Sequence, residues 1–276
     1  MNQEMIKKAV SEFFSSKGYE VLDMFYKKPC DSCLIIDKWD KFNLLPDFLL
    51  KIGSKLFFSF LLTDDSKIPL FKDYIKRFSK ILPSKLFLMH GNQLYEIENI
   101  EDVSKRSLIA QDLFIKEDYA VGPSSRTFKS MSGRWEEQRR IGSKGEEEVA
   151  KLLKASGAEI MDLNFNAPCD SCSNIQNWHS YNKLPDGIAK IKSNIFFYEA
   201  KSKKSRNLIV NERDYIEYQN KLKFLPVNIY FIVFSYDLKK IKEIYLHKVN
   251  MNEHGREHQW NGNYTVDLSN EVEQLA

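Results

Sequence analysis

Three charged residues in the second half of the chain have types and spacings suited to phosphodiester chemistry. Asp186 follows a proline, and Glu199 and Lys201 lie two positions apart near the end of an apolar run. Residues two apart in a β-strand project from the same face of the sheet. Carboxylates placed close together repel one another, and a divalent cation relieves this repulsion. Mg²⁺ takes one or two carboxylates together with water and phosphate oxygens, and a lysine can orient or deprotonate the attacking water.

The element that must bring these residues together is a predicted β-hairpin. Two short apolar runs, Gly187–Ile191 and Ile195–Ala200, flank the polar pair Ser193-Asn194. This pattern is typical of two antiparallel strands joined by a tight turn. In such a hairpin, Asp186 at the start of the first strand lies beside Glu199 and Lys201 at the end of the second. The alternative is an ordinary surface hairpin with solvated charges.

A helix predicted over Arg134–Ser156, with a break at Gly142, contributes a further acid. Four of its residues share one face because their spacing is i, i+3, i+4 and i+7: Glu146, Val149, Ala150 and Leu153. The neighbouring acids Glu147 and Glu148 face lysines and solvent instead. The alternative is that all three acids simply favour the positive end of the helix dipole. We interpret the first of the three as a residue of the metal site.

Pro185-Asp186 followed by Glu199-Ala200-Lys201 resembles the two halves of the signature of the PD-(D/E)XK nuclease superfamily. The resemblance implies an αβββαβ core in which the aspartate and the glutamate hold Mg²⁺ or Mn²⁺ and the lysine assists the water. Archaeal Holliday-junction resolvases and Mrr-like restriction nucleases are similar in placing a glutamate on the first helix facing the metal, which implies this role for Glu146. The backbone carbonyl of Ala200 is then a further metal ligand.

Much of the sequence occurs twice. An offset of 139 residues aligns Ile6–Leu62 with Gly145–Lys201 without a gap, and twenty of the 57 aligned positions are identical. After small shifts, Asp73-Tyr74-Ile75 matches Asp214-Tyr215-Ile216, and Leu82-Pro83 matches Leu225-Pro226. An internal repeat of this kind indicates two copies of one fold. We therefore predict an α/β protein with two tandem PD-(D/E)XK-like αβββαβ domains.

The first copy lacks most of the residues that we expect to do chemistry, and only Asp47, aligned with Asp186, is kept. The replacements are Lys7 for Glu146, Phe60 for Glu199 and Leu62 for Lys201. One carboxylate among apolar residues cannot hold a catalytic Mg²⁺. We therefore interpret residues 1–120 as a degenerate domain, residues 121–141 as a linker and residues 142–276 as the active nuclease domain.

Two further helices are predicted. One covers Val103–Glu117 in the first copy. The other covers Val210–Lys223 in the second copy, where Tyr215 and Gln219 lie i, i+4 apart and are interpreted as exposed. The run Val227–Ser235 that follows is strongly apolar and suits a central buried strand.

Basic residues gather in sequence around the predicted hairpin, and a basic rim beside a metal site suits a phosphate backbone. The alternative is a solvated face in a lysine-rich protein. We predict contacts with nucleic acid, with DNA favoured over RNA, from five residues: Lys190, Lys192, Lys203, Lys204 and Arg206.

The four cysteines form two C-x₂-C pairs, one in each copy: Cys30 with Cys33, and Cys169 with Cys172. Two such pairs could together form a Cys₄ zinc site. A redox dithiol is a weaker alternative because the thioredoxin-like context is missing. A buried turn in which the thiols pack against Trp39 and Trp178 is a third.

Bulk composition sets outer limits. The 276 residues are 43% hydrophobic and 13% aromatic, which supports packed cores, and the net charge is only +3. No apolar run approaches membrane-spanning length and no signal peptide is expected, so we expect a cytoplasmic protein without a membrane partner.

The predicted function is that of a metal-dependent endonuclease in restriction, repair, recombination or defence. One competent copy cuts one strand, so double-strand cleavage would need a dimer or two visits. The partner that we expect besides nucleic acid is a second copy of the chain or another protein. The alternative is a non-catalytic tandem scaffold that binds nucleic acid or protein.

Overall fold

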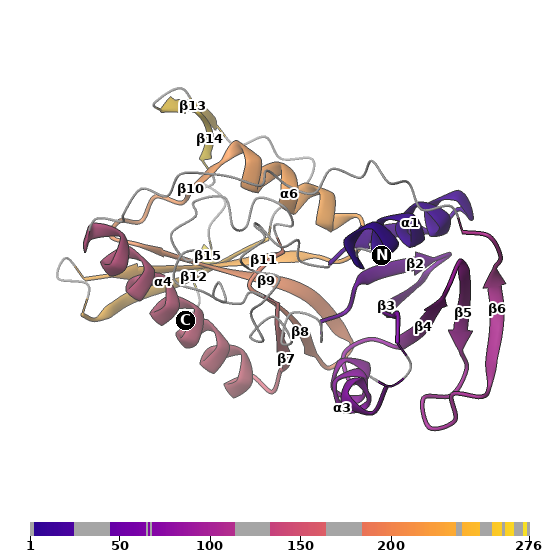
Figure 1. Ribbon diagram of the computed structural model, residues 1–276. Coiled ribbons are helices and arrows are strands. Elements are labelled where there is room, and N and C mark those ends of the chain that lie inside the picture. Colours follow the sequence, from indigo (N-terminus) through magenta and orange to yellow (C-terminus); the bar gives the residue numbers. More distant parts are fainter. Residues whose placement is uncertain are drawn as a thin grey trace. The chain divides into compact units, whose positions relative to one another are not determined.

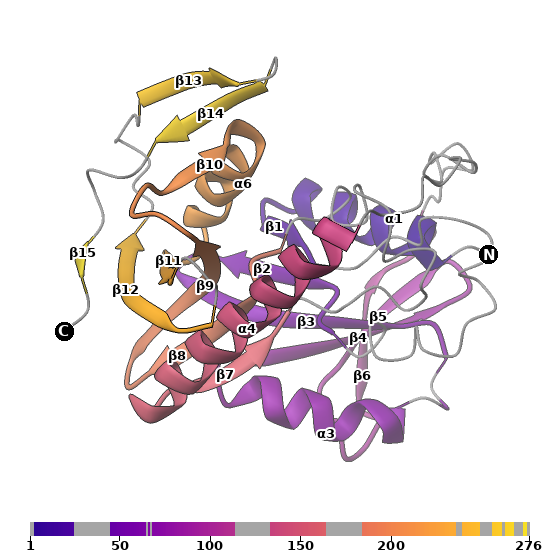
Figure 2. The same cartoon turned by 90° about the vertical axis from the view of Figure 1, so that its left-hand side faces the viewer.

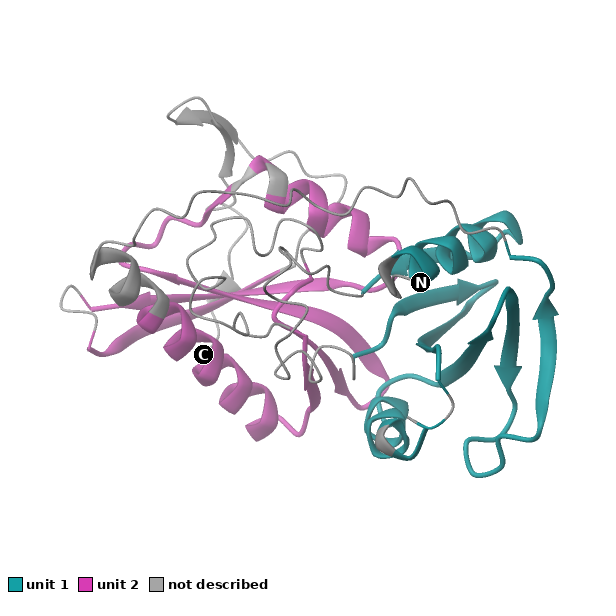
Figure 3. Ribbon diagram, viewed as in Figure 1, with its two compact units in different colours: residues 1–128, 165–182 teal, residues 129–164, 183–276 magenta. Residues whose placement is uncertain are grey.

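The computed structural model describes residues 3–24, 45–64, 66, 68–113, 133–163, 184–235, 239–248, 256–260, 263–267 and 273–274. The chain divides into two compact units (Figure 3). Unit 1 comprises residues 1–128 and 165–182, and unit 2 comprises residues 129–164 and 183–276. The four cysteines and linker positions 121–132 lie outside the described residues, so the zinc site stays a prediction. Within the described ranges, none of the helices combines the length and the apolar character needed to cross a bilayer.

Unit 1 is a mixed α/β structure with a six-stranded sheet in the order β1-β2-β3-β4-β5-β6 (Figure 1). Neighbouring strands are antiparallel except β3 and β4, which are parallel. Its elements are α1 (Gln3–Ser16), β1 (Glu20–Asp23), β2 (Phe48–Ile52), β3 (Lys55–Leu62), α3 (Ile68–Ser79), β4 (Ser84–His90), β5 (Gln93–Ile97) and β6 (Arg106–Ala110).

The two helices of unit 1 cover opposite faces of its sheet. Phe14 of α1 packs with Phe48 and Phe87 in one core cluster, which also includes Leu61 of β3. Phe78 of α3 packs edge-on against Phe60, the residue beside Leu61. Successive residues of a strand point to opposite faces, so β3 is buried on both sides.

Unit 2 has a six-stranded sheet in the order β7-β8-β9-β11-β12-β15 and a three-stranded sheet in the order β10-β14-β13. In the larger sheet β9 and β11 are parallel, and the other pairs are antiparallel. The mixed α/β class expected from the sequence is therefore confirmed. The elements are α4 (Gly133–Ala155), β7 (Glu159–Asp162), β8 (Gly187–Ile191), β9 (Asn194–Lys203), β10 (Ile209–Asn211), α6 (Glu212–Leu222), β11 (Val227–Phe234), β12 (Ile241–Lys248), β13 (Arg256–Trp260), β14 (Asn263–Asp267) and β15 (Glu273–Gln274).

Helices α4 and α6 lie on opposite faces of the larger sheet (Figures 1 and 2). Gly145 of α4 approaches β9 so closely that an added Cβ would lie 2.1 Å from Oγ of Ser202. The ammonium of Lys201, the preceding residue, lies 5.9 Å from the ring centroid of Tyr218 on α6. Helix α4 runs unbroken through Gly142, so the predicted break is wrong and positions 133–141 of the predicted linker are helical. One glycine costs a helix only about 1 kcal/mol, which packing of the flanking turns can offset.

The two units pair their strands in the same register. The antiparallel pair Glu20↔Lys51 in unit 1 corresponds, at the offset of 139, to Glu159↔Lys190 in unit 2. The cross-strand pair Phe48↔Ser59 corresponds to Gly187↔Tyr198. Both of these last pairs set a large residue against a small one. The large residue is Phe48 on β2 in unit 1 and Tyr198 on β9 in unit 2.

Across the second helix and the strand that follows it, the equivalent positions are offset by 143 residues. The backbone N–H of Phe58 donates to the carbonyl of Pro83, and that of Phe197 donates to Pro226 in the same way. The sequence match of Asp73-Tyr74-Ile75 with Asp214-Tyr215-Ile216 is therefore wrong by two residues. Burial shows the same, because Ile75 is 7% exposed whereas Ile216 is 48% exposed.

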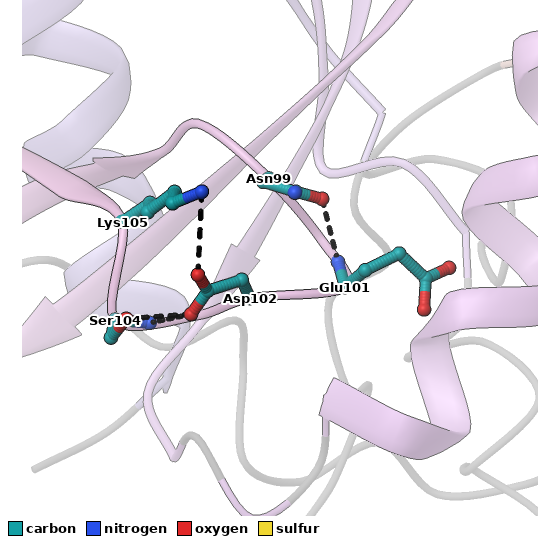
Figure 4. A network of polar contacts seen from close by, with 5 residues as sticks. All are labelled: Asn99, Glu101, Asp102, Ser104 and Lys105. Atoms are coloured by element: carbon teal, nitrogen blue, oxygen red, sulfur yellow. Dashed lines mark hydrogen bonds and ion pairs between the residues drawn. The ribbon is translucent and has the colours of Figure 1, made fainter.

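The helix predicted over Val103–Glu117 is also wrong in the part that the structure describes, where residues 106–110 form β6. The turn that precedes this strand is held by side chains (Figure 4): Asn99 Oδ1 accepts from the N–H of Glu101 at 2.9 Å, and Asp102 Oδ1 accepts from the hydroxyl of Ser104 at 2.6 Å. Short polar side chains that bond nearby backbone or one another stabilise turns at the expense of helix.

Candidate functional site

The hairpin of β8 and β9 places Asp186, Glu199 and Lys201 in contact with one another. The backbone N–H of Asp186 donates to Oε2 of Glu199 at 3.2 Å. The ammonium of Lys201 forms an ion pair with Oε1 of the same glutamate. The backbone N–H of Ala200 donates to Oδ2 of Asp186 at 2.7 Å. The tight turn falls at Lys192-Ser193, one residue earlier than expected.

The carboxyl groups of this site are buried, which disfavours their ionised forms. Asp186 is 8% exposed and Glu199 is 9% exposed. Burial raises the pKa of the Asp186 carboxyl well above its ordinary value, and repulsion from Glu199 and Glu146 raises it further. Lys201 and the N–H of Ala200 act in the opposite direction without cancelling the rise. Three acidic side chains of the site, Asp186, Glu199 and Glu146, thus interact with the ammonium of Lys201.

Glu146 of α4 belongs to the same electrostatic group. Burial raises the pKa of its carboxyl, and repulsion from Glu199 and Asp162 adds to the rise. The adjacent acids are differently placed, because Glu147 and Glu148 lie 2.8 and 3.1 Å from the ammonium of Lys151. Of the three consecutive acids, Glu146 is thus the one that interacts with the hairpin.

Lys201 remains a cation in this environment. Burial lowers the pKa of its ammonium, but Glu199, Asp186 and Glu146 together raise it above the ordinary value. A protonated lysine donates hydrogen bonds and balances negative charge. Because it stays protonated, Lys201 is suited to orienting a water or a phosphate and not to removing a proton.

Helix α6 contributes two residues that the sequence analysis did not select. Tyr218 is 3% exposed and its hydroxyl hydrogen-bonds the side chain of Glu199. Lys221 is 2% exposed and its ammonium lies 3.0 Å from Oε2 of Glu217. Tyr215 was expected to be exposed and is 7% exposed, so that prediction is wrong. The spacing of the two tyrosines, i and i+3, was the available signal for an inward-facing stripe.

The five basic residues do not form one rim. Lys190 and Lys192 lie at the turn end of the hairpin, and six residues of extended strand, roughly 20 Å, separate Lys192 from Asp186. Lys203 and Lys204 instead directly follow the site along the chain, and the former shares a strand face with Lys201. Arg206 is engaged by Glu243, whose Oε2 lies 2.9 Å from its Nε.

The donor set fits a hard divalent cation bound partly by water. Among the residues that the structure describes, no three Asp, Glu, His or Cys side chains lie close enough to enclose a metal ion. Mg²⁺ does not need such a cage, because it keeps several waters and binds through one or two carboxylates plus substrate phosphates. Asp186 and Glu199 supply two adjacent carboxylates, and a cation would relieve the repulsion between them.

The aligned corner of unit 1 is neutralised from within. The ammonium of Lys7 lies 2.6 Å from Oδ1 of Asp47, whose Oδ2 accepts from the N–H of Leu61 at 2.6 Å. Burial raises the pKa of the Asp47 carboxyl, and Lys7 partly offsets the rise. Phe60 and Leu62, at the positions of the site glutamate and lysine, are 0% and 3% exposed. In unit 1, the positions aligned with Glu146 and Glu199 therefore supply no carboxylate for a metal.

Comparison with known proteins gives similarities among solved structures. Neither the comparison with protein families nor that with curated proteins finds a match. Among solved structures, the chain is similar to Hjc, a Holliday junction resolvase from the archaeal hyperthermophile Archaeoglobus fulgidus. The two are 13% identical with a TM-score of 0.31, over 47% of this chain and 86% of that chain.

Proposed function

We propose that unit 2 is a metal-dependent nuclease of the PD-(D/E)XK type and that unit 1 is a degenerate copy of it. The observation that carries the proposal is the contact group of Asp186, Glu199 and Lys201, with Glu146 in electrostatic range. The equal strand registers of the two units support a common origin. A group of buried like charges persists only where something else stabilises it, and a cation at the site would do so.

In this proposal Asp186 and Glu199 hold Mg²⁺ or Mn²⁺, and Glu146 adds charge from α4. The N–H and C=O groups of one strand residue face the same neighbour in an antiparallel pair. Since the N–H of Ala200 bonds the side chain of Asp186, the carbonyl of Ala200 is the backbone group suited to be a further ligand. These four groups are oxygen donors, as Mg²⁺ prefers.

A bound Mg²⁺ would act as a Lewis acid on a phosphate oxygen and would lower the pKa of a coordinated water. Lys201 would orient the attacking water and balance the charge that develops on the phosphate. Lys203 and Lys204 would bind the phosphodiester backbone beyond the site. DNA is the substrate that we favour, and a single site per chain predicts nicking of one strand.

A cleavage assay tests the proposal, with the neighbouring acids Glu146 and Glu147 as a matched pair of variant and control. Supercoiled plasmid, single-stranded DNA and RNA are incubated with Mg²⁺, with Mn²⁺ or with a chelator. The wild type should nick plasmid only with metal, and Asp186→Asn and Glu146→Gln should each slow cleavage by at least about a hundredfold. Glu147→Gln should cleave normally, because that acid pairs with Lys151 outside the site. Binding to DNA without metal-dependent cleavage would instead support the non-catalytic scaffold.

A further inference from the structure

The inward face of helix α6 is polar. Asp214, Tyr218 and Lys221 follow one another at i, i+4 and i+7 and are 8%, 3% and 2% exposed. Burying a lysine or an aspartate costs free energy unless a partner compensates for the lost water. Such a face therefore calls for an explanation beyond packing.

Unit 1 provides an internal comparison for the same helix positions. At the offset of 143, the equivalents on α3 are Phe71, Ile75 and Phe78, which are 5%, 7% and 1% exposed. The two helices bury the same positions to the same extent. The fold thus accepts apolar residues at all three, so the polar residues of α6 are not required by its packing.

The polar positions of α6 face the polar positions of β9. In unit 1, the ring of Phe78 lies 5.7 Å from that of Phe60, which aligns with Glu199. In unit 2 the equivalent of Phe78 is Lys221, whose ammonium interacts electrostatically with Glu199. Tyr218, which replaces Ile75 one turn earlier, hydrogen-bonds Glu199, and the ammonium of Lys201 lies over its ring. The strand and the helix therefore differ together between the units, because these positions are polar on both elements in unit 2 and apolar on both in unit 1.

We propose that Tyr218 is a positioning residue of the site, whose hydroxyl fixes the carboxylate of Glu199 in the orientation that binds the cation. The carboxylate offers about four lone-pair sites. Lys201, the N–H of Asp186 and the Tyr218 hydroxyl occupy three of them, which leaves about one for a metal ion. The ammonium of Lys221, one turn further along α6, supports this arrangement with positive charge. The inference rests on the proposed function, because it assigns Tyr218 to the same site.

The test is Mn²⁺ binding measured by calorimetry on two conservative variants of the same helix. Tyr218→Phe keeps the ring and removes only the hydroxyl. It should weaken Mn²⁺ binding roughly tenfold or more, as loss of a residue that orients a ligand does. Tyr215→Phe makes the same chemical change at a buried neighbour and should leave the Kd unchanged. A Tyr218→Phe variant with the Kd of the wild type would overturn the inference.

A second readout needs no metal and separates this inference from the nuclease proposal. Urea unfolding midpoints are measured with chelator for Tyr218→Phe, Glu199→Ala and the double variant, with Glu199→Gln as the partner if the alanine variant does not fold. If the hydroxyl of Tyr218 holds the carboxylate of Glu199, the double variant should have a higher urea midpoint than the sum of the two single shifts predicts. Additive shifts would contradict the positioning role. If the wild type binds no Mn²⁺, the nuclease proposal fails while this cycle still decides whether Tyr218 positions Glu199.

Discussion

The Nζ atom of Lys7 lies 2.6 Å from Oδ1 of Asp47, a carboxylate that is 2% exposed. The aligned residues of unit 2, Glu146 and Asp186, are both acids, and repulsion from Glu146 raises the pKa of Asp186. Lys7 in place of Glu146 thus removes one repulsive acid and supplies the cation that pairs with Asp47. This relationship explains how unit 1 can keep its aspartate without a metal.

The first prediction concerns the ion pair in unit 1. Replacing Lys7 with methionine should lower the free energy of unfolding by about 3 kcal/mol, because it leaves Asp47 buried without its cation. Adding Asp47→Asn to this variant should recover most of the loss, since the amide oxygen can still accept from Leu61. Urea denaturation measures both effects.

The adjacent lysine is the control for this prediction. Lys8 lies 3.8 Å from Asp23, and both side chains are substantially exposed, so Lys8→Met should cost less than about 1 kcal/mol. Equal losses for Lys7→Met and Lys8→Met would show that the buried pair has no special weight.

The second prediction concerns the reciprocal cross-strand pairs. A Cβ on Gly187 would lie 2.4 Å from the ring of Tyr198, which is 2% exposed. Gly187→Phe should therefore lower the free energy of unfolding by about 1 to 3 kcal/mol or more, because the new side chain overpacks the site. Tyr198→Ser should lower it by about 3 kcal/mol, because it leaves a cavity.

The double variant takes its pair from unit 1, where Phe48 faces Ser59. It should lose less stability than the sum of the single variants by at least about 1 kcal/mol. Strictly additive losses in thermal unfolding would argue that the two units do not share this packing rule.

The third prediction is a pH dependence of the metal-free protein. The pKa values of Asp186 and Glu146 are raised above 3.8 and 4.5 in the fold. Between those ordinary values and the raised ones, the folded chain binds more protons than the unfolded chain, so stability falls as the pH rises through this window. The fall is complete once both carboxyls are ionised in the folded state.

Asp186→Asn should remove part of this fall. Each pKa unit of rise corresponds to about 1.4 kcal/mol, so the variant should exceed the wild type in stability at pH 7 by about 1 kcal/mol or more and lose this advantage near pH 4. Glu147→Gln should bring no gain, because Lys151 lowers the pKa of that exposed carboxyl. Urea unfolding in chelator measures all three proteins. An Asp186→Asn variant less stable than the wild type at pH 7 would refute the prediction.

Local patterns predicted the hairpin, and among three consecutive acids they selected the one that interacts with it electrostatically. Alternating apolar runs around a polar turn gave β8 and β9, and helical spacing singled out Glu146 among three consecutive acids. Both predictions use short-range periodicity, which burial on one face enforces directly.

Long-range partners were predicted less well. Tyr218 was missed because its contact with Glu199 depends on which face of α6 meets the sheet, and that face is set by the position of the helix. The identity of Asp73-Tyr74-Ile75 with Asp214-Tyr215-Ile216 suggested a register that differs from the packed one by two residues. Residues 106–110 form a strand because β5 pairs with them, which no local pattern indicates.

The central claim is that Asp186 and Glu199 form a cation site in unit 2 and that unit 1 has none. Calorimetric titration with Mn²⁺ tests it most directly when the aligned aspartates are exchanged one at a time and circular dichroism shows that both variants are folded. Wild type and Asp47→Asn should bind Mn²⁺ alike, and Asp186→Asn should lose the binding. An Asp186→Asn protein that binds Mn²⁺ as the wild type does, or a wild type that binds none, would contradict the account.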